Sequence, residues 1–306
     1  MKWNKRGLIY NTDKPNTWTN CGAMTPTPIM LDNSTIRIFV SFCDQFGIAR
    51  VGSVDVSAED PKNILRVSST PLVDTGRPGT FDDNGTVACS VTLTQDNTML
   101  MHYVGFELCQ KIRYRLFTGL AISNDMGTSF QKYSEVPVLD RSSTERFFRC
   151  GPYCVNDNGN YKLWYVAGNS WEDIEGKQMP VYVIKYLESQ DGIKWGNCGE
   201  VCIDIENHDE HGFGRPWVIK TDGMYRMFYS VRVKKLGYRL GYAESHDGRK
   251  WTRKDNQLGF DVSHEGWDSE MICFSAIIPY KDRYYMFYNG NDFGKSGFGY
   301  AILESW

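Results

Sequence analysis

Apolar segments recur along this chain in one repeating order. In each of five segments, an apolar strand is followed by a turn, an aromatic-rich strand, a third strand with small residues, and a further turn. The second strands are rich in residues that favour β-structure and span 36–40, 99–103, 161–165, 225–229 and 284–288. The third strands span 51–55, 118–122, 181–184, 240–244 and 298–302. Because helical periodicity does not extend beyond about two turns anywhere, the pattern predicts an all-β chain.

The fifth repeat lacks residues for a fourth strand. Only Glu304, Ser305 and Trp306 remain after its third strand, whereas residues 3–10 at the N-terminus have the composition of a strand. If that N-terminal strand completes the last repeat, the exposed sheet edges at the seam are covered. We therefore predict one domain over residues 1–306, an all-β, five-bladed β-propeller in which the N-terminal strand closes the last blade.

Three of the turns after the third strands share one pattern. Residues 123–130 fit the Asp-box motif, and residues 189–195 and 245–251 are close variants of it. An aspartate beside a glycine accepts backbone N–H groups within a turn, and the closing aromatic residue covers the blade edge. We therefore interpret Asp125, Asp191 and Asp247 as turn residues without a catalytic role.

Composition and charge exclude several classes of protein. The chain is 41% apolar and 23% charged, which is typical of a globular protein, and its net charge of −3 gives no basic footprint for nucleic acid. Neither a signal peptide nor an apolar run of about 18 residues is present, so we expect a cytoplasmic protein that does not bind a membrane. The nine cysteines include two pairs with C-x3-C spacing, unlike zinc or redox motifs. Reduced structural thiols are the expected reading, with a disulfide left open.

Acidic residues precede four of the five innermost strands at similar distances. In a propeller, the loops that lead into the inner strands line the mouth of a central funnel, so polar residues there converge. The alternative for each residue is an internal ion pair, but recurrence in four blades favours a common site. The acids are Asp82 and Asp83, Glu145, Asp209 and Glu210, and Glu270, and basic groups in the same loops are Arg149, Arg215 and His211.

Two further features have both a binding and a structural interpretation. The segment from His208 to His211 contains two histidines and two acids, but no matching third ligand is evident, so we expect no metal or other cofactor and leave open only a hydrated cation on the axis. Trp217 and Trp267 lie near the inner strands, where they could stack on a sugar or pack between blades.

The repeats together with these acids resemble the five-bladed propeller superfamily of invertases, levansucrases, arabinanases, β-xylosidases and mannoside phosphorylases. The resemblance covers nearly the whole chain as a blade pattern and is strongest at 79–85, 214–218, and 267–270 with 288–291. It implies three carboxylates from the first three blades: a base or nucleophile, an acid, and one that orients the sugar. The chain departs from that pattern, because the family's acid positions carry Thr25 or Thr27, residues 87–89, and Arg149 or Cys150.

The first functional hypothesis is a glycosidase that cleaves a glycosidic bond by carboxylic acid and base chemistry in the axial funnel. Glu145 and Glu270 are the predicted catalytic pair, with Asp82 or Asp83 orienting the sugar, and we expect both glutamates and Arg215 to point into one funnel. The predicted substrate-binding residues are Arg149, Arg215, His211, Trp217, Trp267 and Asp268.

Three other hypotheses remain open. The second is a glycoside phosphorylase, or an enzyme acting on a phosphorylated or nucleotide-linked sugar, in which Arg149, Arg215 and His211 hold the phosphate. The third is a sugar-binding propeller without catalysis, suggested by the missing acids. A sialidase ranks last, because it needs an arginine triad. In each of the first three cases the expected partner is a carbohydrate or a sugar phosphate.

Overall fold

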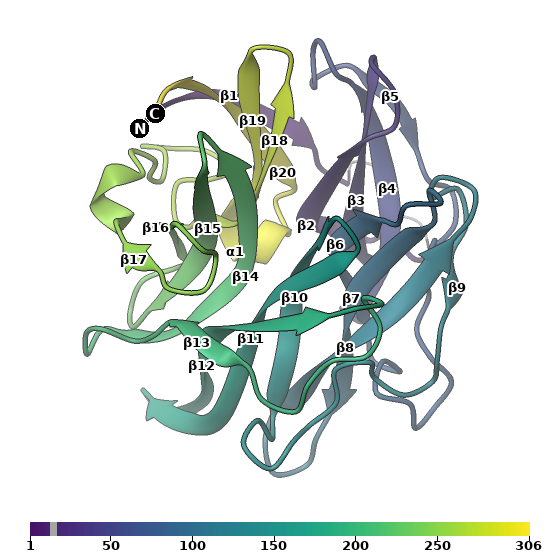
Figure 1. Ribbon diagram of the computed structural model, residues 1–306, viewed down its shortest axis with the longest axis vertical. Helices are drawn as coiled ribbons and strands as arrows, with labels where there is room; N and C mark the ends of the chain where they lie inside the picture. The colour runs from purple at the N-terminus through teal and green to yellow at the C-terminus, as the bar shows by residue number, and fades with distance from the viewer. Residues whose placement is uncertain (13–16) are drawn as a thin grey trace.

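β-Strands account for nearly all the regular structure of the chain (Figure 1). The computed structural model describes residues 1–12 and 17–306, in which the helical segments are only the single turns η1 (Asp255–Gln257) and α1 (Asn291–Gly294). Within those ranges no helix has the length and apolar character that crossing a bilayer requires. The expectation of an all-β chain is confirmed.

The strands pair into antiparallel groups of four that follow the sequence repeats and are numbered here as sheets I to V. Sheet I contains β2 (Cys21–Met30), β3 (Thr35–Cys43), β4 (Ala49–Ser57) and β5 (Ile64–Val67), and sheet II contains β6 (Thr86–Leu93), β7 (Met99–Leu108), β8 (Tyr114–Ser123) and β9 (Gln131–Lys132). Sheet III contains β10 (Phe148–Asp157), β11 (Asn160–Ile174), β12 (Lys177–Ser189) and β13 (Glu200–Ile203). Sheet IV contains β14 (Glu210–Thr221), β15 (Met224–Val233), β16 (Arg239–Ser245) and β17 (Thr252–Arg253). Sheet V contains β18 (Cys273–Tyr280), β19 (Arg283–Asn289), β20 (Phe298–Ser305) and β1 (Lys2–Tyr10).

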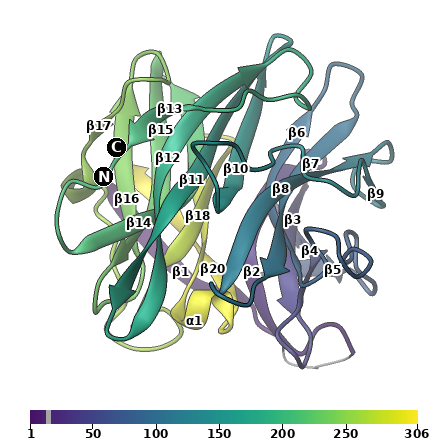
Figure 2. The same ribbon diagram turned by 90° about the horizontal axis from the view of Figure 1, so that it is seen from below.

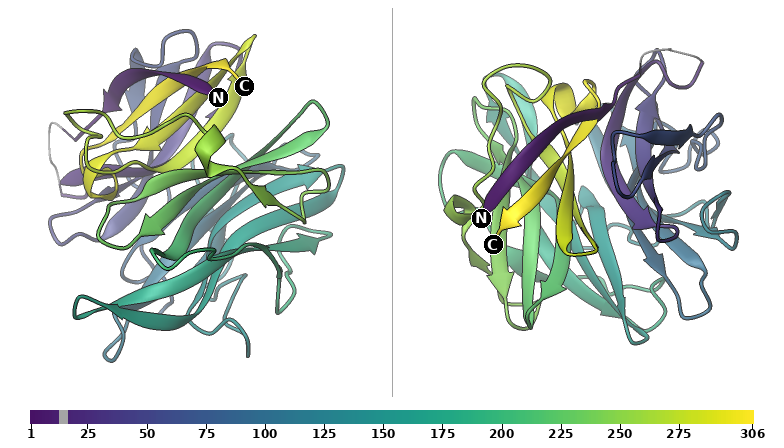
Figure 3. Two further views of the ribbon diagram at one scale, coloured as in Figure 1. Left: turned by 90° about the vertical axis from the view of Figure 1, so that its left-hand side faces the viewer. Right: turned by 90° about the horizontal axis from the view of Figure 1, so that it is seen from above.

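The first and last strands of the chain lie side by side (Figure 3). β1 pairs antiparallel with β20, so that Trp3 is opposite Leu303 and Tyr10 is opposite Phe298. The predicted pairing of residues 3–10 with the last strand is therefore confirmed. Short parallel pairings between β8 and β10 and between β12 and β14 also connect sheets II, III and IV (Figure 2).

The apolar core lies between neighbouring sheets. One cluster joins Phe39 and Val51 of sheet I to Met101 and Phe117 of sheet II, and similar clusters join sheets II and III and sheets III and IV. Because both faces of each sheet are covered, the second strands carry apolar residues at consecutive positions instead of alternating with polar ones. This explains why these strands stand out in the sequence.

The Asp-box turns have the predicted geometry. The carboxylate of Asp191 accepts the N–H groups of Ile193 and Lys194, and Asp247 makes the equivalent bonds to Arg249 and Lys250. Asp125 accepts the N–H groups of residues 128 and 129, and the hydrogen bonds that it receives lower its pKa to about 2. The prediction that these three aspartates are turn residues is confirmed.

Candidate ligand-binding site

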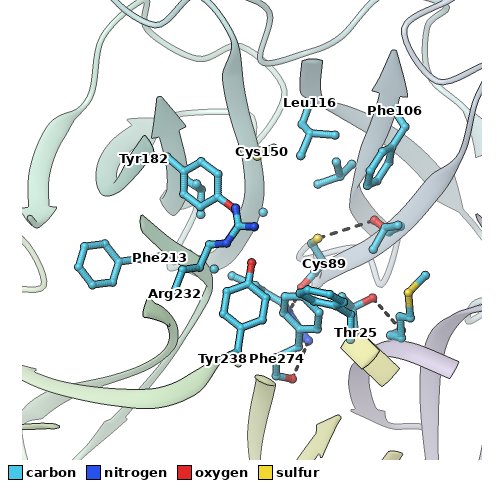
Figure 4. Close-up of a pocket in the computed structure, with 18 of the residues that line it drawn as sticks. Thr25, Cys89, Phe106, Leu116, Cys150, Tyr182, Phe213, Arg232, Tyr238 and Phe274 are labelled. Atoms are coloured by element: carbon cyan, nitrogen blue, oxygen red, sulfur yellow. Dashed lines mark hydrogen bonds between the residues drawn. The ribbon is translucent and has the colours of Figure 1, made fainter. Parts of the chain in front are cut away.

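A cavity of about 350 Å³ lies where the innermost strands of all five sheets meet (Figure 4). Each inner strand contributes at least one lining side chain near its N-terminal half, and these include Thr25 on β2, Cys89 on β6, Cys150 on β10, Arg215 on β14 and Phe274 on β18. Of the polar residues that the sequence predicted to converge ahead of the inner strands, only Arg215 lines this space. We call this space the axial cavity.

Each inner strand has a β-bulge beside the axial cavity. The pairing register shifts within residues 24–27, 88–90, 150–153, 214–217 and 273–276. Bulges re-aim side chains and are common next to functional sites. Thr25 and Phe274 also adopt positive φ angles of 53° and 55°, which a β-branched or bulky residue rarely takes. Such strain persists where the surroundings enforce it, and it clusters at functional sites.

Arg215 holds these bulged segments in place. Its guanidinium donates hydrogen bonds to the backbone carbonyls of Pro26, Cys89 and Phe274, which belong to three different sheets, and to the hydroxyl of Thr27. Burial lowers the pKa of Arg215 to about 10, so the group keeps its positive charge at neutral pH. No carboxylate of the described residues forms an ion pair with it. The positive charge is therefore solvated by dipoles and not neutralised.

Arg232 is the second buried cation of the axial cavity. Its side chain extends from β15, is 8% exposed, and donates to the hydroxyl of Tyr182. The guanidinium lies 5.2 Å from the ring centroid of Tyr182 and 5.3 Å from that of Tyr238. These rings stabilise the cation but do not neutralise it, and in the described part of the chain no acid pairs with it. At the rim, the exposed Arg113 adds a third positive group.

The opposite side of the axial cavity is apolar. Val87, Val104, Phe106 and Leu116 of sheet II line it, and Figure 4 shows Phe106 and Leu116 across from Arg232 and Tyr182. We call these four residues the apolar wall. The axial cavity thus has a side with buried cations from sheets III and IV and an apolar wall from sheet II, which also supplies Arg113 and Tyr114 to the lining.

The positions where the resemblance implies carboxylates do line the axial cavity. They carry Thr25, Val87, Cys89 and Cys150, and among the described lining residues there is no aspartate or glutamate. Burial raises the pKa of the Cys89 thiol to about 12 and also raises that of Cys150. Because the thiolate is the nucleophilic form, neither cysteine replaces a missing carboxylate as a nucleophile.

The predicted catalytic pair does not lie in the axial cavity. Of Glu145, Glu270 and Arg215, which we expected in one funnel, only Arg215 is a lining residue. Glu145 is 1% exposed and accepts hydrogen bonds from Tyr165 and Lys185, at 2.8 Å each, while Arg149 lies 2.7 Å from it. Glu270 is exposed. The catalytic roles of both residues stay predictions, but the shared funnel was a wrong expectation for the two glutamates.

Glu145 belongs to an arrangement that recurs in four sheets, in which a tyrosine at one position of the second strand and a cation both contact a buried or half-buried carboxylate. In sheet II, Asp82 accepts from Tyr103 at 2.8 Å and from Lys132 at 2.6 Å. In sheet V, Asp268 accepts from Tyr288 at 2.9 Å and from Lys5 at 2.7 Å. Sheet IV uses Tyr229, Asp255 and Arg253. Of the acids that recur before the inner strands in the sequence, Asp82, Glu145 and Glu210 therefore form ion pairs within their own sheets, the alternative that the sequence had left open.

The remaining predicted site residues also lie outside the axial cavity lining. Arg149 donates to the carbonyls of residues 140 and 196 as well as facing Glu145, and Trp217 donates to the carbonyl of Ile277 while packing on Tyr153. His211 donates from Nδ1 to Pro180, and burial together with the charge of Arg232 lowers its pKa, so it is neutral at pH 7. Trp267 packs on Tyr288, and Asp83 accepts the N–H of Gly79. Glu210 pairs with Arg253.

Sequence reasoning missed Arg232, Tyr182 and Tyr238, which form the cationic side. The available signal was positional: Arg232 lies three residues after Tyr229 on β15. The equivalent residue in sheet II, three after Tyr103, is Phe106, which lines the opposite side. The ends of the second strands therefore supply the side chains that differ between the two sides.

Comparison with known proteins places the chain in a family. No family model matches it. The uncharacterized protein Rv1502 of Mycobacterium tuberculosis strain H37Rv is 32% identical over 305 residues, which cover 100% of both chains. The uncharacterized protein MT1551 of strain CDC 1551 has the same identity and coverage. The chain belongs to the family of these two proteins. Its members named here carry no described activity, so the family alone does not identify a substrate.

Solved structures similar to this chain are glycoside hydrolases. One described as "Glycoside hydrolase" has a TM-score of 0.75 at 18% identity and covers 98% of this chain and 90% of that chain. A thermostable family-43 glycoside hydrolase has a TM-score of 0.68 at 16% identity, covering 94% and 91%. A structure from the GH130 family of mannoside phosphorylases, described as containing hydrolases that target β-1,2 mannosidic linkages, has a TM-score of 0.70 at 15% identity, covering 98% and 93%. The resemblance to propeller-type glycoside hydrolases is thus confirmed at the level of the fold.

Proposed function

We propose that this chain is a single five-bladed propeller, closed by its N-terminal strand, that binds an anionic sugar derivative in its axial cavity. The ligand class is a phosphorylated or nucleotide-linked sugar, as in the second hypothesis from the sequence. The observation that carries the proposal is the pair Arg215 and Arg232, two buried guanidinium groups that line the axial cavity without an acidic partner in the described residues. The cytoplasmic location expected from the sequence would agree with it, because phosphorylated sugars occur there.

Electrostatics favour an anion over a neutral sugar. Desolvating a charged group is costly unless a countercharge or hydrogen bonds compensate it. Arg215 donates its hydrogen bonds to backbone carbonyls and the Thr27 hydroxyl. Arg232 has one hydrogen bond to Tyr182 and otherwise contacts aromatic rings. A phosphate or carboxylate group would accept the remaining donors of Arg232 in a charge-assisted, bidentate geometry.

Hydrolysis by two carboxylates is the less favoured function. It needs an acid and a base or nucleophile on opposite sides of one glycosidic bond, separated by about 5–9.5 Å. The described lining of the axial cavity has neither, and Glu145 and Asp82 are engaged by tyrosine and lysine inside their sheets. The similarity to glycosidases therefore supports the fold and a sugar ligand more than it supports this mechanism.

Binding measurements with charged and neutral sugars test the proposal. Isothermal titration calorimetry of glucose 6-phosphate, mannose 6-phosphate and UDP-glucose is expected to give saturable binding, whereas glucose and mannose bind at least about tenfold more weakly. Arg232→Gln is expected to weaken the binding of the charged ligands by about tenfold to a hundredfold, while Arg146→Gln, at an exposed arginine outside the axial cavity, leaves it unchanged.

Two results would contradict the proposal. Equal affinity for charged and neutral sugars would remove the role of the arginines. Turnover of nitrophenyl glycosides that is lost in a folded Glu145→Gln variant would restore the glycosidase hypothesis.

A further inference from the structure

A simple sugar phosphate has no apolar group that would pack against the apolar wall. Such a ligand carries a hydroxyl on most of its carbons, and each buried hydroxyl needs a hydrogen-bond partner. Val87, Val104, Phe106 and Leu116 offer none. A bare sugar placed against them would lose hydration without replacement.

The buried cations and the apolar wall come from different sheets, although sheet II also supplies the lining residues Arg113 and Tyr114. The cationic side consists of Arg232, Tyr182 and Tyr238 from sheets III and IV, and the apolar wall comes from sheet II (Figure 4). Both sides belong to one continuous space of about 350 Å³, within the range of pockets that hold small-molecule ligands. A ligand that fills it therefore presents an anion to one side and hydrocarbon to the other.

The mouth continues the apolar surface. Phe293 lines the axial cavity, is 46% exposed, and packs edge-on against Tyr238 at 5.3 Å. Met179 lines the rim near Arg113. Flexible thioether and exposed aromatic side chains at an opening suit the passage of an apolar group.

We propose that the natural ligand is a glycoside of an anionic sugar whose aglycone is apolar, with the anionic group at Arg232 and the aglycone against the apolar wall. This inference rests on the proposed function and specifies its ligand class. The aglycone is an aryl or branched alkyl group, because flat rings and branched chains match the Phe106 and Leu116 surfaces. No bond is made or broken in this proposal, which concerns recognition.

Three ligands that combine the sugar with the phosphate, the aryl group or both test this inference. 4-Nitrophenyl β-D-glucoside 6-phosphate carries both groups, glucose 6-phosphate lacks the aryl group, and 4-nitrophenyl β-D-glucoside lacks the phosphate; the matching mannosides are measured in parallel. By calorimetry, the first probe is expected to bind at least about tenfold more tightly than either of the others, since burying the equivalent of two methylene groups suffices for that ratio.

Variants on β7 locate the aryl group. Phe106→Ser is expected to abolish the tenfold advantage of the aryl ligand and leave the affinity for glucose 6-phosphate unchanged. Leu108→Ser is the matched control, because Leu108 lies two residues away on the same strand, is 61% exposed and does not line the axial cavity.

The outcomes separate this inference from the proposed function. Equal binding of glucose 6-phosphate and its aryl glycoside overturns the inference and leaves the proposed function standing. Tight binding of the neutral aryl glycosides with no gain from phosphate overturns the proposed function and keeps the apolar wall as an aglycone site. If none of the probes binds, both are overturned.

Discussion

Arg215 combines a structural and an electrostatic task in one side chain. Its four hydrogen bonds join carbonyl and hydroxyl groups on sheets I, II and V, and they include the carbonyl of Phe274, which has a strained backbone. The arginine fork is needed for this, since a lysine ammonium has three donors at one point instead of five spread over a plane.

We therefore expect Arg215→Lys to lower the free energy of unfolding by about 2 kcal/mol, the net value of about two lost hydrogen bonds. Anionic ligands are expected to bind more weakly to the folded variant, with a smaller effect on neutral sugars, because the charge remains but is displaced. Urea denaturation and calorimetry measure the two effects separately. A variant as stable as the parent would show that the carbonyl bonds contribute little.

His102 makes stability depend on pH. It is fully buried in sheet II and donates from Nε2 to the carbonyl of Gly192 at 2.8 Å. Burial lowers its pKa from 6.5 to about 4. The unfolded chain therefore binds a proton more readily than the folded protein between pH 6.5 and 4, so this contribution is complete above pH 6.5 and is lost as the pH falls toward 4.

The loss in the free energy of unfolding is expected to reach about 3 kcal/mol at pH 4. Other groups also titrate there, so the comparison is with His102→Gln, which keeps an N–H donor but does not ionise. Denaturation curves collected from pH 7 to 4 should show that the free energy of unfolding falls more steeply with decreasing pH for the parent protein than for the variant. Parallel pH profiles would mean that folding does not lower the pKa of His102.

At the level of the elements, the same positions in successive sheets perform the same tasks. The carbonyl of Gly192 in one Asp-box turn accepts a bond from His102 of the preceding sheet, and Gly248 in the next turn accepts one from Trp164. His102 and Trp164 occupy equivalent positions in β7 and β11, directly before the tyrosines Tyr103 and Tyr165. These two Asp-box turns thus connect sheets III and IV to the sheets that precede them.

In sheets II, III and V the tyrosine–carboxylate–cation arrangement fastens the loop before the inner strand to the sheet of that strand. Glu145→Gln removes the only carboxylate that faces both Arg149 and Lys185 in the described residues. Leaving buried cations without a partner costs about 3–5 kcal/mol, and we expect a loss of that size in chemical denaturation. Glu270→Gln, at an exposed position, is the control and is expected to change stability by less than about 0.5 kcal/mol.

This pair of variants also decides between structural and catalytic readings of Glu145. A Glu145→Gln protein with unchanged stability but lost turnover of a glycoside would contradict the structural role assigned here.

For the whole molecule, the sequence was sufficient for the strand repeats but not for the site. The second strands and Asp-box turns are visible because each uses local chemistry, and the missing strand of the last repeat pointed to β1. The direction in which a loop side chain points depends on contacts with residues distant in the sequence. Asp82 and Glu145 precede the inner strands, as residues that line the funnel would, but tyrosines of their own sheets bind them away from the axial cavity. Sheet I, where Val40 replaces the tyrosine, is also the repeat with no acid in the eight residues before Pro28. That correlation was present in the sequence and favoured the structural reading.

The closure of the propeller proposed above depends on the pairing of β1 with β20 at the two ends of the chain. β1 contributes Trp3 and Ile9 to the core cluster shared by sheets I, IV and V, and Lys5 neutralises the buried Asp268. Deleting residues 1–10 would expose the edge of β20 and leave Asp268 without its lysine. Because a sheet edge and a buried charge are both unfavourable, we expect the truncated chain to lose its cooperative unfolding transition or to associate through β20.

Two further variants distinguish edge pairing from charge. Lys5→Met removes only the ion pair, and it is expected to lower stability while preserving a single cooperative transition. Supplying residues 1–10 as a separate peptide to the truncated chain is expected to restore that transition in circular dichroism melts, because the strand pairs through its backbone. If the truncated chain unfolds as cooperatively as the full chain and remains monomeric in size-exclusion chromatography, then β1 is a covering strand and the ring is held by the packing between sheets I and V alone.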